Sequence, residues 1–136
     1  EVGTEHVAPL LKSRLEIANK TSSPSVAEFI STLAKWEEYR SQMLAFMENY
    51  DVVVGPANAH VAPFHGHAID RFPGAFSYSH AYNIAGWPAV VIRGGTSEEG
   101  MPIGVQVVAR PWREDLALAV AAHIEGSFGP FDHPKL

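Results

Sequence analysis

The sequence predicts an α/β fold, with a mixed sheet of few strands flanked by helices. Three observations support it: a long amphipathic helical pattern before residue 50, three short runs of β-branched residues, and a last helical pattern after Pro111. The expected order is helix, helix, strand, hairpin, helix. Three strands make a small sheet for helices of this length, so at least one sheet edge is expected to be open. A missing partner segment or a second copy of the chain would then cover that edge.

Two helices are predicted near the N-terminus from the spacing of apolar residues. Residues 8–19 form a short helix with Leu11 and Leu15 along one side. Ser25 then stands three residues before Glu28, which is the capping-box spacing at a helix start. The apolar residues that follow recur at intervals of three or four on a helix of roughly seven turns. They are Phe29, Ile30, Leu33, Trp36, Met43, Leu44, Met47 and Tyr50.

The sheet is predicted from three apolar runs bounded by turn residues. Residues 52–54 are all valine and a Gly-Pro pair follows them, which fits a central strand covered on both faces. Residues 57–75 are rich in Pro and Gly and are predicted as irregular, with a short helix at 76–85. Strands at 89–93 and 103–109 are joined by a polar connection bracketed by glycines, which predicts a hairpin with a longer loop.

The last helix is predicted to open at Pro111, because proline is well tolerated in the first helical turn. Its apolar residues recur along one face, and Gly126 marks its end. A length of 136 residues predicts one domain. A domain of this size can bury a real core, but it is small for a complete hydrolase.

Composition and charge exclude several classes of protein. The net charge of −5 argues against nucleic acid or an anionic membrane as the main partner, because basic patches drive both kinds of binding. No apolar stretch approaches the roughly 20 residues of a membrane-spanning helix. The absence of cysteine rules out disulfides and Cys-ligated zinc, and fits a cytoplasmic location. The first residues lack an initiator Met and the pattern of a signal peptide, so we expect a processed protein or a fragment of a longer one.

Three stretches together resemble the C-terminal third of the amidase-signature family. Residues 50–56 (YDVVVGP) resemble its Tyr-Asp-apolar-apolar-apolar-x-Pro strand, which also follows a long helix. Residues 83–90 (NIAGWPAV) resemble its Asn-apolar-x-Gly-x-Pro-Ala element, and residues 100–108 (GMPIGVQVV) its Gly-Leu-Pro-x-Gly-apolar-Gln strand. The order and spacing of the three stretches make the resemblance specific. The two N-terminal helices resemble the family more weakly.

The resemblance implies a fold with a large mixed sheet flanked by helices, and hydrolysis of a small carboxylic amide through an acyl-enzyme without metal or organic cofactor. It implies a serine nucleophile, a second serine in a cis peptide, a lysine base and a Gly/Ser-rich tract that binds the oxyanion. All of these lie N-terminal to the region that residues 1–136 resemble. We therefore expect a C-terminal fragment of an amidase-signature domain that lacks the Ser-Ser-Lys residues and is inactive when isolated.

No catalytic residue is assigned within the chain. A lysine base needs burial or charged neighbours to lower its pKa, and the four lysines lie on polar helix faces, beside a loop or in the tail. They are Lys12, Lys20, Lys35 and Lys135. Residues 94–97 (GGTS) resemble a Gly/Ser-rich tract, but Glu98 and Glu99 follow and would repel an oxyanion. This tract is expected to be an ordinary hairpin loop.

The resemblance also implies that the stretch before Asn83 approaches the substrate. In the glutaminyl-tRNA amidotransferase branch an acidic residue there meets the substrate's amino group, whereas residues 76–80 of this chain read FSYSH and contain no acid. Phe76 and Tyr78 are therefore candidate pocket residues for an uncharged, partly aromatic substrate. The alternative interpretation is that both are core aromatics.

The other family-motif residues are expected to be structural. Asn83 can satisfy backbone groups at a helix end, Gly86 permits a positive φ, and Pro88 fixes the start of the next strand. Gly104, which lies in the stretch 100–108, is expected to be structural as well. Gln106 lies on the strand face opposite its valine neighbours and is expected to tie a loop or a neighbouring strand by hydrogen bonds.

Two other functions are weighed against the amide hydrolase. Because imidazole is a common metal ligand, His60, His65, His67 and His80 could form a metal site, and the His65-x-His67 spacing allows chelation from an extended strand. However, no His-Glu-x-x-His helix is present, so surface histidines are the simpler interpretation. The chain could also be a non-catalytic interaction module whose exposed apolar surface binds a second copy, giving a dimer or other homo-oligomer.

Overall fold

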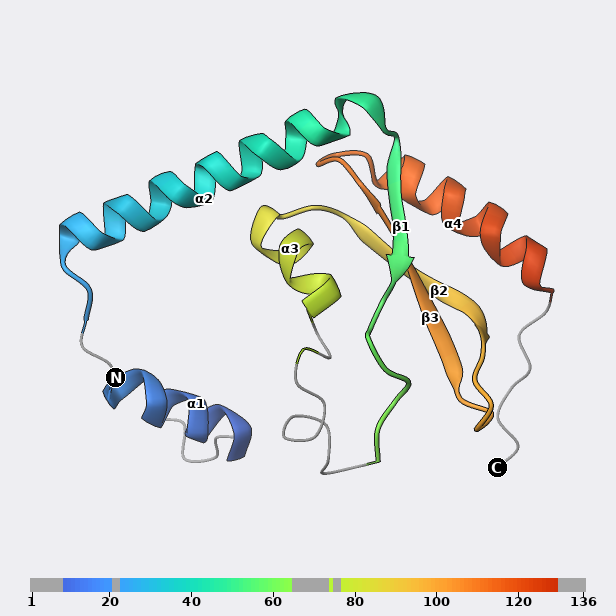
Figure 1. Ribbon diagram of the computed structural model, residues 1–136, viewed down its shortest axis with the longest axis horizontal. Helices are drawn as coiled ribbons and strands as arrows, with labels where there is room; N and C mark the ends of the chain where they lie inside the picture. The colour runs from blue at the N-terminus through green and yellow to red at the C-terminus, as the bar shows by residue number, and fades with distance from the viewer. Residues whose placement is uncertain (1–8, 21–22, 65–73, 75–76, 130–136) are drawn as a thin grey trace. The chain divides into compact units, whose positions relative to one another are not determined.

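The computed structural model describes residues 9–20, 23–64, 74 and 77–129 (Figure 1). Their order is helix, helix, strand, helix, hairpin, helix, which confirms the predicted α/β class. The elements are α1 (Pro9–Lys20), α2 (Val26–Phe46), the 3-10 turn η1 (Met47–Asn49), β1 (Val52–Pro56), α3 (Ser77–Ala85), β2 (Ala89–Thr96), β3 (Pro102–Ala109) and α4 (Glu114–Phe128). The chain separates into two compact units, residues 1–35 and 36–136, with the boundary inside α2.

The predicted capping box is present at the start of α2. The Ser25 backbone N–H donates to the Glu28 carboxylate at 2.8 Å, and the Glu28 backbone N–H donates to the Ser25 hydroxyl oxygen at 3.2 Å. The Ser25 hydroxyl also donates to the same carboxylate, at 2.7 Å. These bonds satisfy N–H groups that the first helical turn leaves without intrahelical partners.

The sheet has the strand order β1-β3-β2, and both pairings are antiparallel. Gln106 of β3 stands opposite Gly55 of β1 and Val91 of β2. β1 and β2 thus run in the same direction, but β3 lies between them and no parallel pair forms among the described strands. Where a mixed sheet was expected, these three strands are antiparallel only, because β2 and β3 form a hairpin and β1 pairs with β3 rather than with β2.

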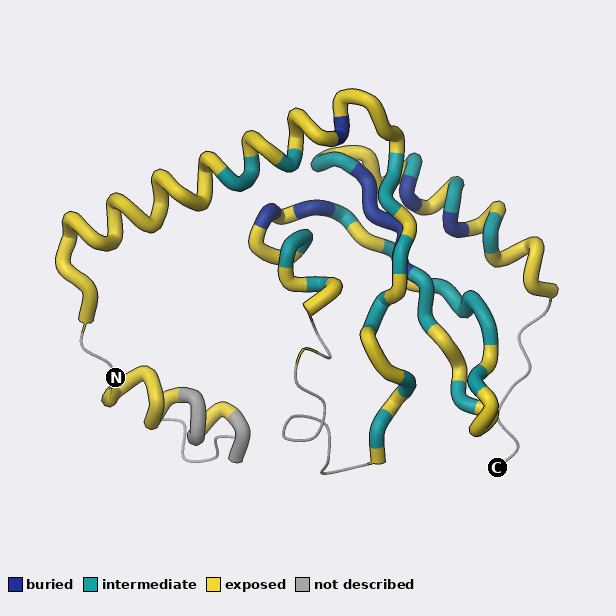
Figure 2. Tube along the Cα trace, viewed as in Figure 1, coloured by how far each residue is buried: buried dark blue, intermediate teal, exposed yellow. Residues whose placement is uncertain are grey.

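The main apolar core lies where the end of α2, η1, α3 and the sheet meet. Met47, Ala85, Trp87 and Val108 are buried there, with Met47 and Val108 at 0% exposure. Figure 2 shows buried, dark-blue stretches at the end of α2, after α3 and along β3. Burying a side chain such as Met47 stabilises a fold by about 1.5–3 kcal/mol. The partly buried residues packed against this core are Tyr39, Met43, Val53 and Tyr82.

The helix α4 packs against β2 and β3. Its Ala117 and Ala121 are buried, and their small side chains allow the helix to approach the strands closely. Val107 and Ala109 are fully buried as well, one position out of phase with Val108. Because side chains alternate along a strand, β3 buries residues on both of its faces. This agrees with the expected role of a central strand, although the central strand is β3 and not the valine run of β1.

The end of α3 is closed by a Schellman motif centred on Gly86. The Trp87 N–H donates to the Tyr82 carbonyl at 3.0 Å and the Gly86 N–H to the Asn83 carbonyl at 3.3 Å. These are the two bonds of the motif, and Gly86 has the positive φ of 73° that the motif requires. The rings of Tyr82 and Trp87 lie 6.4 Å apart and supply the apolar contact that accompanies it.

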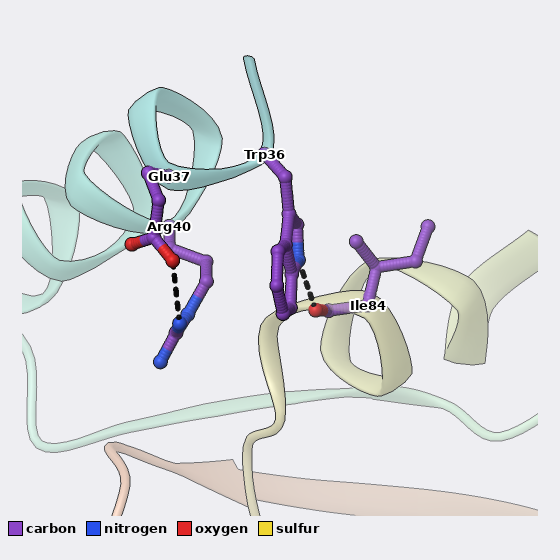
Figure 3. A network of polar contacts seen from close by, with 4 residues as sticks. All are labelled: Trp36, Glu37, Arg40 and Ile84. Carbon is purple, nitrogen blue, oxygen red and sulfur yellow. Dashed lines mark hydrogen bonds and ion pairs between the residues drawn. The ribbon is translucent and has the colours of Figure 1, made fainter. Parts of the chain in front are cut away.

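A side chain from α2 satisfies a further carbonyl at the same helix end (Figure 3). The Trp36 indole N–H donates to the Ile84 carbonyl oxygen at 2.6 Å. The Arg40 guanidinium lies 5.2 Å from the centre of the Trp36 ring and pairs with Glu37 at 3.2 Å. The ion pair is solvent-exposed and contributes little, so the indole bond is the principal polar link between α2 and α3 at this end.

The last helix begins later than predicted. α4 starts at Glu114, and Pro111 lies in a turn before it, closed by a 3.1 Å bond from the Arg113 N–H to the Arg110 carbonyl. Trp112 has a φ of 67°. Proline followed by a residue with positive φ fits a type II turn, so Pro111 initiates a turn and not the helix.

Much of the apolar stripe on α2 is exposed. Within residues 26–46 no side chain is buried, and Val26, Phe29 and Ile30 are each more than half exposed. On the sheet, Val54 and Val91 are also half exposed or more. Among the described residues, no helix is both long and apolar enough to cross a bilayer.

We expect Gly86→Ala to lower the free energy of unfolding by about 1–2 kcal/mol, because an alanine pays the steric cost of the left-handed conformation. Gly126→Ala is the matched control. Gly126 lies inside α4 without a positive φ, and a Cβ there meets no atom within 4 Å. It should raise stability by up to about 1 kcal/mol. Urea unfolding of the two variants measures both values, and equal effects would contradict the Schellman assignment.

The capping box gives a pH dependence. The Ser25 hydroxyl and then its backbone N–H hold the pKa of the Glu28 carboxyl below its ordinary value. A lowered pKa stabilises the folded state above the unfolded pKa, and this stabilisation is lost as the pH falls through the folded pKa. The helical circular dichroism signal should therefore fall on acidification more in the unsubstituted chain than in Ser25→Ala. The difference should be small because the group is exposed, and parallel titrations of both proteins would contradict the interpretation.

Candidate functional site

Gln106, in the middle of β3, links two other segments of the chain through its side chain. Gln106 is 5% exposed, and its side-chain nitrogen donates to the Pro56 carbonyl at 2.8 Å and to the Tyr78 carbonyl at 3.0 Å. The hydrogen bonds expected of Gln106 are therefore present, and one of them crosses to a neighbouring strand as expected. The second was not foreseen, because it joins β3 to the first turn of α3.

Tyr78 lies in the first turn of α3 and is 45% exposed in the described part of the chain. Its backbone carbonyl is held by Gln106. Its role as a pocket residue, and the alternative of a core aromatic, both stay predictions. Phe76, the other pocket candidate, lies outside the described residues.

The strands approach closely beside this cluster. The Ala57 N–H donates to the Gly104 carbonyl at 3.0 Å, which extends the pairing of β1 and β3 by one residue. A Cβ on Gly104 would lie 3.1 Å from the Ala57 Cβ and 3.2 Å from a Val91 methyl. Glycine at this motif position therefore permits tight packing across all three strands.

Asn58 is a candidate that the sequence interpretation missed. It lies two residues after Pro56, within about 7.6 Å of it along the chain. Its side-chain oxygen is buried, with no hydrogen-bond partner in the described part of the chain. A buried acceptor without a donor is uncommon and draws attention to this end of β1. Nothing in the sequence marks it, because asparagine in a Pro/Gly-rich segment is typical of turns.

The second family motif lies at the other end of α3. Gly86 has the positive φ that was expected of it. Pro88 directly precedes β2, and its carbonyl accepts a bond from the Ala109 N–H at 3.2 Å. Asn83 contributes its backbone carbonyl to the helix end, and the role expected for its side chain stays a prediction. Close by, burial and then the neighbouring Tyr39 raise the pKa of the Tyr82 phenol.

The candidate nucleophile-activating residues do not gather in the described structure. Lys12, Lys20 and Lys35 are exposed, and Lys135 lies outside the described residues. Of the GGTS tract, Gly94, Gly95 and Thr96 belong to β2, which is shifted in register between Arg93 and Gly95. The turn itself runs from Ser97 to Gly100, closed by a 3.0 Å backbone bond. The tract is thus an ordinary hairpin with its bulge.

The predicted histidine cluster is only partly described. His60 and His80 are exposed, and His65 and His67 lie outside the described residues. Among the described side chains, no group of three or more His, Asp or Glu residues is arranged to hold a metal ion. Surface positions for His60 and His80 agree with the simpler interpretation.

Comparison with known proteins identifies the family. A family model described as Amidase matches residues 1–118. The chain belongs to the amidase family. The three motifs of the amidase resemblance lie within the matched residues and occupy β1, the end of α3 with the start of β2, and β3.

Individual amidase-family relatives agree with this assignment. Fatty-acid amide hydrolase 2-B of Danio rerio is 33% identical over 120 residues, covering 88% of this chain. The 6-aminohexanoate-cyclic-dimer hydrolase of Pseudomonas sp. (strain NK87) is 49% identical over 51 residues, covering 38% of this chain and 10% of the relative. The structure of a 6-aminohexanoate cyclic dimer hydrolase complexed with substrate matches with a TM-score of 0.70 and 26% identity.

The matched amidases are much longer than this chain. The match spans 22% of the Danio rerio protein, and the structural match covers 83% of this chain but 27% of the hydrolase. The described fold therefore corresponds to a part of the matched hydrolase. The assignment of residues 1–136 to one C-terminal fragment of an amidase-signature domain stays a prediction.

We expect this amidase-family chain to retain no stoichiometric metal after dialysis against a chelator-free buffer, because His60 and His80 are surface residues. Metal analysis by mass spectrometry measures the ratio of zinc, nickel and copper to protein. One bound metal ion per chain, lost in His65→Ala and kept in an exposed control such as His123→Ala, would instead favour the histidine site.

Proposed function

We propose that the chain forms the C-terminal part of an amide hydrolase that cleaves carbon–nitrogen bonds of a small, uncharged carboxylic amide through a serine acyl-enzyme. The observation that carries the proposal is the match to the amidase family over residues 1–118, together with the placement of its motifs on one sheet. Two serines and a lysine from another part of the polypeptide would supply the chemistry. The chain would supply a wall of the substrate pocket.

The geometry around Tyr78 supports this division of roles. The lysines in the described part of the chain are all exposed, whereas a lysine that acts as a base needs burial or charged neighbours. In contrast, Tyr78 is nearly half exposed, and its backbone is anchored by Gln106. An aromatic wall without a carboxylate favours an uncharged, partly aromatic acyl or amine group over a substrate with a free amino group.

The exposed apolar surfaces give the second candidate function, an interaction module. Val26, Phe29 and Ile30 of α2 and Val91 of β2 are each more than half exposed. Apolar surfaces of this kind are typical of interfaces. In the amide hydrolase these residues would meet the remainder of a longer polypeptide, and in the isolated chain a second copy could cover them.

The decisive experiment compares the 136-residue chain with a protein expressed together with the coding sequence that precedes it. We expect the longer protein to release amine from aryl and aliphatic amides in preference to ammonia from glutamine, and the 136-residue chain to turn over none of them. Preference for glutamine would refute the uncharged substrate. Turnover by the 136-residue chain would show that the catalytic residues lie within it.

Sedimentation distinguishes the two candidate functions. Concentration-dependent self-association of the 136-residue chain that disappears in Phe29→Glu would support an interaction surface on α2. A clean monomer with low binding of an apolar dye would argue against it. Ser41→Glu, which adds the same single negative charge at an exposed position of α2, is the control.

A further inference from the structure

We propose that Gln106 is a positioning residue that sets the selectivity of the substrate pocket through Tyr78. The inference rests on the proposed amide hydrolysis and goes beyond it, because it assigns a specific task to a side chain that itself touches no substrate. Gln106 would hold the first turn of α3 at a fixed place against the end of β1. The position of the Tyr78 ring would follow from that contact.

Gln106 is suited to this task by its burial and by its hydrogen bonds. The side chain is 5% exposed, and its one amide nitrogen donates to two carbonyl oxygens, those of Pro56 and Tyr78. A primary amide has two N–H donors on that nitrogen, so both are used. Pro56 and Tyr78 are distant in sequence, and this single side chain joins the backbone segments to which they belong.

The two ends of α3 are held in different ways. Its C-terminal end is fixed by the Schellman bonds at Gly86 and by the Trp36 indole. At its start, the Ser77 N–H and hydroxyl both donate to the Gly74 carbonyl, at 3.0 Å and 2.6 Å. Gln106 adds a bond from the distant strand β3 to the same turn. Its loss would remove that restraint from the first turn and leave the bonds at the far end intact.

Tyr78 is the residue whose position that loss of restraint would change. Gln106 bonds to the Tyr78 backbone carbonyl, and Tyr78 is 45% exposed. If the backbone of Tyr78 moves by up to about 1 Å, its ring moves with it. Misplacing a substrate-positioning group by about this distance can lower the rate of the reaction strongly. A large aryl substrate that contacts the ring would be affected more than a small aliphatic one.

The experiment uses the longer protein with an anilide and with propionamide as substrates. In Gln106→Met, which keeps length but loses both donors, we expect kcat/KM for the anilide to fall about tenfold or more and that for propionamide by less than about threefold. In a protein that already carries Tyr78→Ala, Gln106→Met should alter the ratio of kcat/KM for the anilide to that for propionamide by less than about twofold. The effects of two substitutions are not additive when one residue acts through the other. Gln42→Met, at an exposed glutamine of α2, is the matched control.

A second variant keeps the test informative if Gln106→Met does not fold. A glutamate at this position lies against two carbonyl oxygens in a buried place, so its pKa is raised, and only its protonated form can donate one of the two bonds. In Gln106→Glu the anilide-to-propionamide ratio should recover partly as the pH falls. Because both rates are measured in the same protein, the pH dependence of catalysis itself cancels.

The outcomes separate this proposal from the one on which it rests. Equal losses on both substrates, additive effects with Tyr78→Ala, or a ratio in Gln106→Glu that does not change with pH would each show a merely structural role and overturn the proposal. An unsubstituted protein that hydrolyses neither amide would overturn the proposed function and this inference together. An active protein whose selectivity is unchanged by Gln106→Met would overturn the inference alone.

Discussion

The packing of Trp87 against Met47 and Val108 is the interaction on which the rest of the 36–136 unit depends. These three residues come from the connection between α3 and β2, from η1 and from β3, so one cluster joins segments distant in sequence. Trp87 can enter it only because Gly86 adopts a positive φ and turns the chain sharply after α3. The backbone conformation of one glycine therefore decides whether the largest side chain of the core reaches its partners.

Two polar contacts then fix α3, and each satisfies a main-chain oxygen. Trp36 from α2 bonds the Ile84 carbonyl near the end of the helix, and Gln106 from β3 bonds the Tyr78 carbonyl near its start. A carbonyl in the first turn of a helix normally accepts its intrahelical bond, and its second lone pair is available to another donor. Trp36 comes from α2 and Gln106 from β3, so each end of α3 is tied to a different element. These two contacts at its ends, rather than a long apolar face, orient the short helix.

The sequence was enough to predict a structural feature where that feature depends on residues close together in the chain. The capping box of Ser25 and Glu28 and the left-handed Gly86 follow from residue types at fixed offsets, and both are observed. Pro111 was misassigned because proline favours a first helical turn and the second position of a turn equally well. Trp112 then gave no turn signal, since a bulky residue is unusual at a position with positive φ.

The candidate site could be predicted only in part, for a physical reason. That Gln106 would make hydrogen bonds followed from a long polar side chain between valines, but its second partner did not. The Tyr78 carbonyl reaches it only through tertiary folding, and any residue at position 78 would offer the same carbonyl. Likewise, Asn58 is notable only because its side-chain oxygen is buried without a partner among the described residues, which no sequence pattern indicates.

The described residues leave several large apolar side chains in contact with water. In the described residues the buried apolar set contains four alanines among eight members, whereas Phe29, Ile30 and Val91 remain more than half exposed. Folding gains free energy roughly in proportion to the apolar area removed from water, so a fold that leaves these residues in solvent forgoes a large share of it. Covering Val91 with additional protein would remove more apolar area from water and so stabilise the sheet further.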